Sequence, residues 1–179
     1  LGHGHQHFSD IQKLPNLHAM IALLRDGFHP QSEGGSIELA GDGTPIIDYV
    51  INDYLWDGVR RSWLSMAEIQ FAAGAKAVRA SHVDSPWFTS WEEAKAGINA
   101  LEFRSNAFTA GSAHCMGGLT MGEDQTRCLV DSNGKYHHLD NLYVFDGSVF
   151  PTSIGANPQL SIYGMACKQA NKLLETLKA

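Results

Sequence analysis

Residues 111–122 read Gly-Ser-Ala-His-Cys-Met-Gly-Gly-Leu-Thr-Met-Gly, and this stretch decides how the rest of the chain is interpreted. A glycine-rich loop lets the main chain approach a ligand closely. Histidine side chains exchange protons near neutral pH, which suits them to act as general bases. His114 is therefore a candidate base, and the alternative is a structural histidine, the commoner role of a lone histidine.

Downstream of this loop, Leu142–Phe145 is a compact apolar run typical of a buried strand, and Asp146-Gly147 follows it directly. Ligands bind at the carboxyl ends of the strands in parallel sheets, so this pair is a candidate binding element. A simple turn is the alternative. The next polar pair upstream, His137-His138, is expected to be solvated in a turn.

A helix is predicted from Pro158 to Leu177, with Asn157 as its N-cap. The first turn of such a helix presents free amides and a partial positive charge, which can hold an anion or polarise a carbonyl group. Ordinary capping is the alternative role of Asn157. One apolar face of this helix is expected to pack on a core, and its residues are Leu160, Tyr163, Cys167, Ala170 and Leu174.

Upstream of the loop, alternating residues predict a hairpin with strands at Ser36–Ala40 and Ile46–Ile51. Apolar residues at three- and four-residue steps then predict a helix over 53–77, with Asp53 as its N-cap and its end near Gly74.

A second helix is expected to begin at the capping box Ser90–Glu93 and to run to Leu101, with Glu93 reaching back to the cap amide. Near the beginning of the chain, Leu17–Leu24 is expected to form a helix of two turns. Together these patterns predict a mixed α+β module.

Composition excludes several classes of protein. The 13 Lys and Arg against 19 Asp and Glu give a formal charge of −6, so no basic surface is expected for a nucleic acid. No apolar run approaches the roughly 18 residues of a membrane span. The three cysteines contain no Cys-x-x-Cys pair, which argues against a disulfide scaffold or a thiolate zinc site.

The chain also contains no Gly-x-Ser-x-Gly, P-loop or Gly-x-Gly-x-x-Gly motif, so nothing favours a hydrolase, a phosphate-cradling loop or a dinucleotide fold. It opens on Leu-Gly-His without a signal peptide, which suggests a piece of a larger protein. Free thiols fit a reducing compartment, so the cytoplasm is expected, with the periplasm as the alternative. The alternating His3, His5 and His7 leave a metal-binding alternative open, but no carboxylate stands at convincing spacing, so no metal site is expected.

Three blocks, taken together and in this order, resemble the C-terminal part of the glucose–methanol–choline (GMC) flavin oxidoreductases. They are His114–Gly122, Leu142–Thr152 and Gly155–Gln159. Gly118 stands where the family usually has threonine. The hairpin and helix over 35–77 also resemble the family's substrate domain.

The resemblance implies FAD as the cofactor, with most of its binding site on an N-terminal part, and an alcohol or sugar hydroxyl as the substrate. It implies that His114 takes the hydroxyl proton while hydride passes to flavin N5, and that Asn157 hydrogen-bonds the substrate oxygen. The residues that it places beside the cofactor are Asp146, Gly147, Asn157, Pro158, Gln159 and Leu160.

The resemblance also implies two domains. Residues 1–138 would belong to a substrate-binding domain with a mixed or antiparallel sheet and helices. Residues 139–179 would return to the FAD domain as a strand and a helix, whose apolar surface a flavin-domain chain or a second copy would cover. A non-catalytic binding module that keeps this fold is the alternative function.

Overall fold

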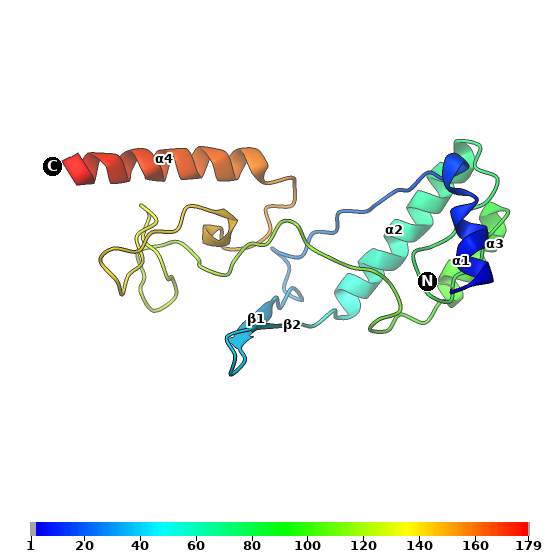
Figure 1. Cartoon of the computed structure of the whole chain (residues 1–179), viewed down its shortest axis with the longest axis horizontal. Helices are drawn as coiled ribbons and strands as arrows, with labels where there is room; N and C mark the ends of the chain where they lie inside the picture. Colours follow the sequence, from blue (N-terminus) through cyan, green and yellow to red (C-terminus); the bar gives the residue numbers. More distant parts are fainter. Residues whose placement is uncertain (1–2, 179) are drawn as a thin grey trace. The chain divides into compact units, whose positions relative to one another are not determined.

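The computed structural model describes residues 3–178, which form two compact units. Unit 1 comprises the residues up to Leu24 together with Ile51–Gly111, and unit 2 comprises Arg25–Val50 together with the residues from Ser112 on. Unit 1 is helical and unit 2 combines a two-stranded sheet with a long helix (Figure 1), so the α+β class is confirmed. The boundary near residue 138 lies inside unit 2, and the assignment of its two sides to substrate and FAD domains stays a prediction.

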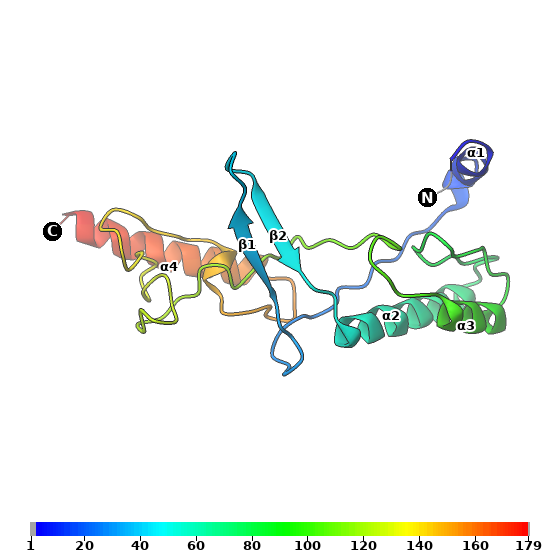
Figure 2. The same ribbon diagram turned by 90° about the horizontal axis from the view of Figure 1, so that it is seen from below.

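Unit 1 is built on two helices, α2 (Asp53–Ala72) and α3 (Trp91–Ala100), which lie side by side in Figures 1 and 2. The inward face of α2 follows the three- and four-residue spacing that the sequence showed, because that spacing places apolar side chains on one stripe of a helix. The loop after α2 completes the core with a short antiparallel bridge between Val78 and Phe88. The buried core residues of this unit are Val59, Trp63, Ala67, Val78, Ala80, Phe88, Ala94 and Ile98.

The beginnings of both helices are capped, with two adjustments to the predictions. Asn52, not Asp53, is the N-cap of α2, because its side chain accepts a hydrogen bond from the Leu55 amide at 3.2 Å. Ser90 caps α3 as predicted, accepting from the Glu93 amide at 3.2 Å. The Glu93 carboxylate reaches back to the amide of Thr89, one residue before the cap, at 2.9 Å.

The predicted two-turn helix at Leu17–Leu24 is wrong, because this segment has no regular secondary structure. An apolar run this short cannot sustain a helix without packing along one face. The helical turns lie earlier, in α1 (His5–Ile11) and η1 (Leu14–Asn16). α1 is attached to the rest of unit 1 through Asp10, whose carboxylate accepts a hydrogen bond from the Arg79 guanidinium at 2.8 Å.

The predicted hairpin in unit 2 is confirmed. Strands β1 (Gly35–Leu39) and β2 (Pro45–Tyr49) pair antiparallel, with Gly35 opposite Tyr49 and Ile37 opposite Ile47 (Figure 2). Its turn is closed by the Asp42 carboxylate, which accepts a hydrogen bond from the Thr44 amide at 2.9 Å.

The predicted strand at Leu142–Phe145 does not form. Tyr143 makes a single antiparallel bridge with Lys135, and Leu142 is exposed. A central strand needs a partner on each edge, and within the described residues this run has only the one bridge. The chain continues instead through η2, a 3-10 turn at Gly147–Val149.

The predicted helix after Pro158 is confirmed as α4 (Gln159–Lys178), but the face predicted to pack on a core is exposed in this chain. Leu160, Tyr163, Cys167 and Leu174 are all exposed. A second, mainly apolar stripe of the helix faces the rest of unit 2 instead. The fully buried residue on that stripe is polar, Gln169. α4 therefore has two apolar faces, and the spacing of the apolar residues does not show which of them is buried.

Candidate functional site

The glycine-rich loop is fastened to the segment around η2 by main-chain hydrogen bonds. The amide of Leu119 donates to the Ser148 carbonyl at 3.0 Å, and the amide of Met121 donates to the Val149 carbonyl at 3.0 Å. Gly117 makes this approach feasible: its φ is +84°, and an added Cβ would lie 3.3 Å from the Pro151 carbonyl oxygen. The first two sequence blocks are thus held side by side by backbone.

The Asp146 carboxylate has a local role in this structure. It caps η2 by accepting hydrogen bonds from the Ser148 amide at 2.8 Å and from the Ser148 hydroxyl at 2.5 Å. Val149, the last residue of η2, is fully buried. The turn after Asp146 is therefore held by two hydrogen bonds to one oxygen of the Asp146 carboxylate.

Gly147 is the point where the first two sequence blocks meet the first turn of α4. A Cβ added there would lie 3.1 Å from the carbonyl oxygen of Cys115 and 3.1 Å from Cδ1 of Ile162. Cys115 follows His114 in the glycine-rich loop, and Ile162 lies in the first turn of α4. The absence of a side chain at Gly147 thus lets the histidine loop approach the beginning of α4.

Asn157 stands at the entry of α4, as predicted. Its side-chain oxygen accepts a hydrogen bond from the Gln159 amide at 3.3 Å, and the first helical bond runs from the Ile162 amide to the Pro158 carbonyl at 2.9 Å. The amides of Leu160 and Ser161 therefore have no partner within the helix itself. Leu160 is 85% exposed, so this end of the helix is open.

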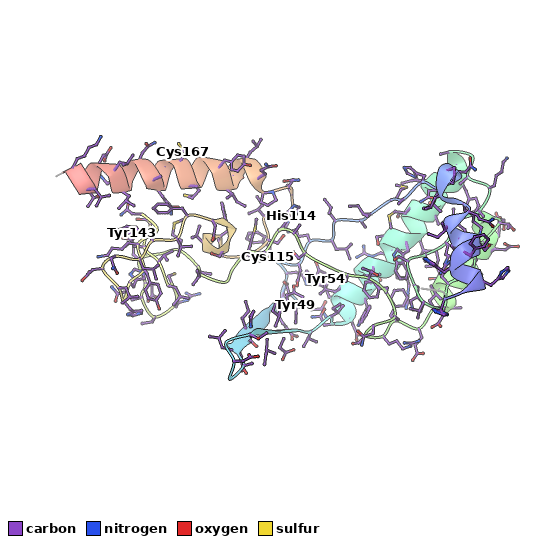
Figure 3. All side chains as sticks on the ribbon, viewed as in Figure 1. Tyr49, Tyr54, His114, Cys115, Tyr143 and Cys167 are labelled. Atoms are coloured by element: carbon purple, nitrogen blue, oxygen red, sulfur yellow. The ribbon has the colours of Figure 1, made fainter. Side chains whose placement is uncertain are left out.

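His114 is half-buried in the same unit, and Figure 3 shows it beside Cys115 in the loop that begins unit 2's second segment. Its amide donates to the Ser112 hydroxyl at 3.2 Å, and the Cys115 thiol donates to the Ser112 carbonyl at 3.7 Å. Both bonds lead back to Ser112, so they form a turn at the residues that carry the imidazole. His114, Asp146, Gly147 and Asn157 thus all belong to one compact unit.

Two residues that support the loop were missed by sequence reasoning. His137, expected to be solvated, is half-buried and its Nε2 bonds the Gly122 carbonyl at 2.9 Å. Gln169 on α4 donates from Nε2 to the Met121 sulfur at 3.4 Å. The only signal for Gln169 is its place on the helical stripe of Ile162 and Met165, where a polar residue stands out.

Carboxylates near the loop are held in local hydrogen bonds. The hydroxyl of Ser132, followed by its backbone amide, holds the pKa of Glu123 below its usual value. The Thr126 hydroxyl, followed by its amide, does the same for Asp124. Both side chains therefore remain ionised at neutral pH and stabilise turns of the loop region rather than exchange protons.

Two large aromatic side chains lie in unit 1, away from these residues in the sequence. Trp63 is a core residue of unit 1, and Trp87 donates its indole N–H to Asp10 at 3.3 Å. In the part of the chain that the structure describes, no three His, Cys, Asp or Glu side chains gather into a metal-binding group. Each helix between residues 3 and 178 is too short or too polar to cross a membrane.

Comparison with known proteins finds several relatives that are oxidases. The chain is 37% identical over 84 residues to the 6'''-hydroxyparomomycin C oxidase of Streptomyces lividus, covering 47% of this chain and 15% of that protein. It is 29% identical over 150 residues to an uncharacterized GMC-type oxidoreductase of Sinorhizobium fredii, covering 81% and 28%. A long-chain-alcohol oxidase of Arabidopsis thaliana is 25% identical over 161 residues, covering 83% and 20%.

The chain thus spans less than a third of the length of these relatives. The family model described as GMC oxidoreductase, which covers the C-terminal domain of that family, matches residues 30–166. That range holds all three sequence blocks, the hairpin, α2 and α3. The chain belongs to the GMC oxidoreductases, as a C-terminal part of that family's fold.

Proposed function

We propose that this chain supplies the catalytic residues of an FAD-dependent enzyme that oxidises an alcohol or sugar hydroxyl, with His114 as the base. The observation that carries the proposal is the meeting of three segments at Gly147: the backbone next to His114, the turn after Asp146 and the first turn of α4. The names of relatives support the hydroxyl substrate, since one of them is a long-chain-alcohol oxidase and another a cholesterol oxidase.

The residues at the entry of α4 fit the edge of a flavin. The unpaired amides of Leu160 and Ser161 are donors at the positive end of a helix, which suits an electron-rich ring edge that gains negative charge on reduction. Backbone at Asp146 and Gly147 would contribute beside them, since Oδ1 of the Asp146 carboxylate already accepts both bonds of the cap. FAD, when bound, supplies the acceptor for the hydride that leaves the substrate carbon.

Asn157 is oriented for donation. Because its Oδ1 accepts the Gln159 amide, its Nδ2 hydrogens remain to donate to a substrate oxygen. An amide cannot accept the hydroxyl proton as a base, so that proton goes to the imidazole of His114 as the C–O bond becomes a carbonyl. A donor placed where charge develops contributes on the order of 3 kcal/mol to the transition state.

The exposed face of α4 fits the expected return to a flavin domain. Leu160, Tyr163 and Leu177 are large apolar or aromatic residues at 85%, 60% and 73% exposure. Burying such a stripe against another domain stabilises a complex by the hydrophobic effect. This face is therefore the proposed contact with the flavin-binding part of the complete enzyme.

The test is a His114→Ala substitution in a full-length oxidoreductase that carries this chain. Loss of a positioned base slows turnover by about 10²- to 10⁴-fold, while visible flavin absorbance stays at its wild-type level. His138→Ala is the matched control, because His138 is exposed in the same unit and bonds no part of the candidate site. Unchanged turnover in His114→Ala would favour the non-catalytic binding module instead.

A further inference from the structure

A short segment distant in sequence packs directly on the loop that leads to Asn157. Gly27 is buried with φ +155°, and a Cβ added to it would overlap the Thr152 hydroxyl oxygen and lie 3.2 Å from the backbone nitrogen of Ser153. Backbone atoms cannot move aside as a flexible side-chain end can. Glycine at position 27 therefore sets how closely this segment approaches residues 152–153.

The neighbouring side chain covers the next glycine of the same loop. Gly155 has φ +73°, and a Cβ there would lie 2.7 Å from Cδ and 3.0 Å from Nε of Arg25. The Arg25 guanidinium also stacks on the ring of Phe28, with its central carbon 4.8 Å from the ring centroid. Stacking of this kind fixes a planar guanidinium in one place, which an ammonium group would not match.

The segment is itself anchored. The Asp26 carboxylate accepts hydrogen bonds from the hydroxyls of Ser32 and Tyr49. Tyr49, labelled in Figure 3, is the last residue of β2. The hairpin, Asp26 and the loop at 152–155 thus form one continuous set of contacts within unit 2.

We propose that Arg25–Phe28 is a positioning clamp for Asn157. It contacts the loop at Thr152, Ser153 and Gly155, while Gly117 packs against Pro151 at the beginning of that loop. Ala156 and Asn157 follow Gly155, and the Asn157 side chain caps the beginning of α4. The importance of this clamp for turnover rests on the function proposed above, but its effect on the geometry of Asn157 does not.

The clamp is tested first without any cofactor, by NMR on the 179-residue chain. In Gly27→Ala and in Arg25→Ala, the Asn157 side-chain amide signals shift and the Gln159 amide exchanges with solvent faster. An exchange increase of about tenfold is expected for Gly27→Ala, since forcing a side chain into a disfavoured backbone conformation opens the loop locally. Arg25→Lys shows a smaller change, because lysine keeps the charge but not the planar stack.

Gly43→Ala is the matched control. Gly43 also has positive φ, at +84°, but a Cβ there meets no atom within 4 Å, so the Asn157 and Gln159 signals stay unchanged. The clamp is overturned if those signals are unaltered in both Gly27→Ala and Arg25→Ala, or if the changes spread evenly over unit 2. Should Gly27→Ala fail to fold, Arg25→Ala decides alone, because the Arg25 side chain is exposed.

A kinetic arm separates the clamp from the catalytic proposal. In the full-length enzyme, Arg25→Ala lowers kcat with little change in KM, and adds nothing further when Asn157 is already alanine, because coupled residues are not additive. If Asn157→Ala leaves kcat unchanged while the NMR signals still respond to Arg25→Ala, the clamp stands and the proposed role of Asn157 fails. If the double variant shows the full sum of both losses, Arg25 acts independently of Asn157 and the clamp is overturned.

Discussion

The two units of this chain are held together in different ways. Unit 1 is held by side chains: Trp63 packs against the rings of Phe103 and Phe108, with centroids 5.5 and 5.7 Å apart, inside a core built from α2 and α3. Unit 2 is held by backbone: glycine-rich loops bond one another through main-chain groups, and its largest fully buried side chains among the described residues are Val130, Val149 and Gln169.

This difference suits unit 1 to act as a scaffold and unit 2 to carry a site. A packed core resists change and gives one arrangement of helices, whereas loops set by glycine contacts can place polar groups close to a ligand. The candidate residues His114 and Asn157 both lie in the loop-built unit. Perturbing packing should therefore affect unit 1 strongly, and perturbing glycines should affect unit 2.

The largest expected effect comes from Trp63→Ala in unit 1. Trp63 is 8% exposed and contacts Phe103, Phe108 and His82, so its removal leaves a large cavity and costs about 3–5 kcal/mol of unfolding free energy. Urea unfolding measures this loss. Trp87→Ala is the comparison and costs less, because the Trp87 ring is only half-buried and lies against the cations Lys13 and Arg79. Equal losses in the two variants would contradict the assignment of Trp63 to the core.

A pair of helical glycines then gives effects of opposite sign. In α3, a Cβ added at Gly97 would lie 2.5 Å from Cζ of the buried Phe88 ring, so Gly97→Ala overpacks unit 1 at a cost of about 1–3 kcal/mol. In α4, a Cβ at Gly164 meets nothing within 4 Å, so Gly164→Ala stabilises the helix by roughly 1 kcal/mol. Thermal unfolding of both variants checks the signs. A gain in Gly97→Ala would show that Phe88 can move aside.

Within unit 2, Gly117→Ala tests the backbone pairing of the loops. Alanine at φ +84° costs roughly 1–2 kcal/mol, and its Cβ would press on the Pro151 carbonyl. The amides of Leu119 and Met121 should then exchange faster, while the amides of α2 remain protected. Gly134→Ala is a poor control because Phe145 crowds it, so Gly43→Ala serves again. Faster exchange throughout α2 would contradict the independence of the two packing modes.

The sequence predicted the structure of unit 1 better than that of unit 2. The three- and four-residue spacing of apolar residues predicted α2, and Val59 and Trp63 on that stripe are buried, because packing against one neighbour decides that helix. The same method failed on α4, where two apolar stripes compete and only tertiary contacts select the one with Gln169. The run at Leu142–Phe145 has strand composition, but a strand exists only where neighbours complete its ladder.

The candidate site was predicted by a different route. His114 and Asn157 stood out through motifs that resemble a family, since neither periodicity nor charge distinguishes them from structural residues. The contacts of Gly27 and Arg25 with the Asn157 loop had no signal of that kind, because they join segments separated by most of the chain. Contacts over such separations depend on the fold, and a local pattern does not reveal them.

The smallest expected effect is a pH response that again separates the units. The Lys13 ammonium, followed by the Arg79 guanidinium and the Trp87 indole, holds the pKa of Asp10 below its usual value of 3.8. Because the folded pKa is lowered, the attachment of α1 is at full strength above that value and is lost as the pH falls through the lowered pKa. The Trp87 indole N–H resonance should therefore move only below pH 3.8, and it should not titrate in Asp10→Asn.

Asp124 in unit 2 provides the contrast. Its pKa is also lowered, first by the Thr126 hydroxyl, but both of its hydrogen bonds stay within two residues. Protonation of Asp124 should therefore shift the Thr126 amide alone, whereas protonation of Asp10 changes resonances of Arg79 and Trp87, far along the sequence. If the Trp87 resonance moves above pH 3.8, or if it still titrates in Asp10→Asn, then Asp10 is not the group that attaches α1 to unit 1.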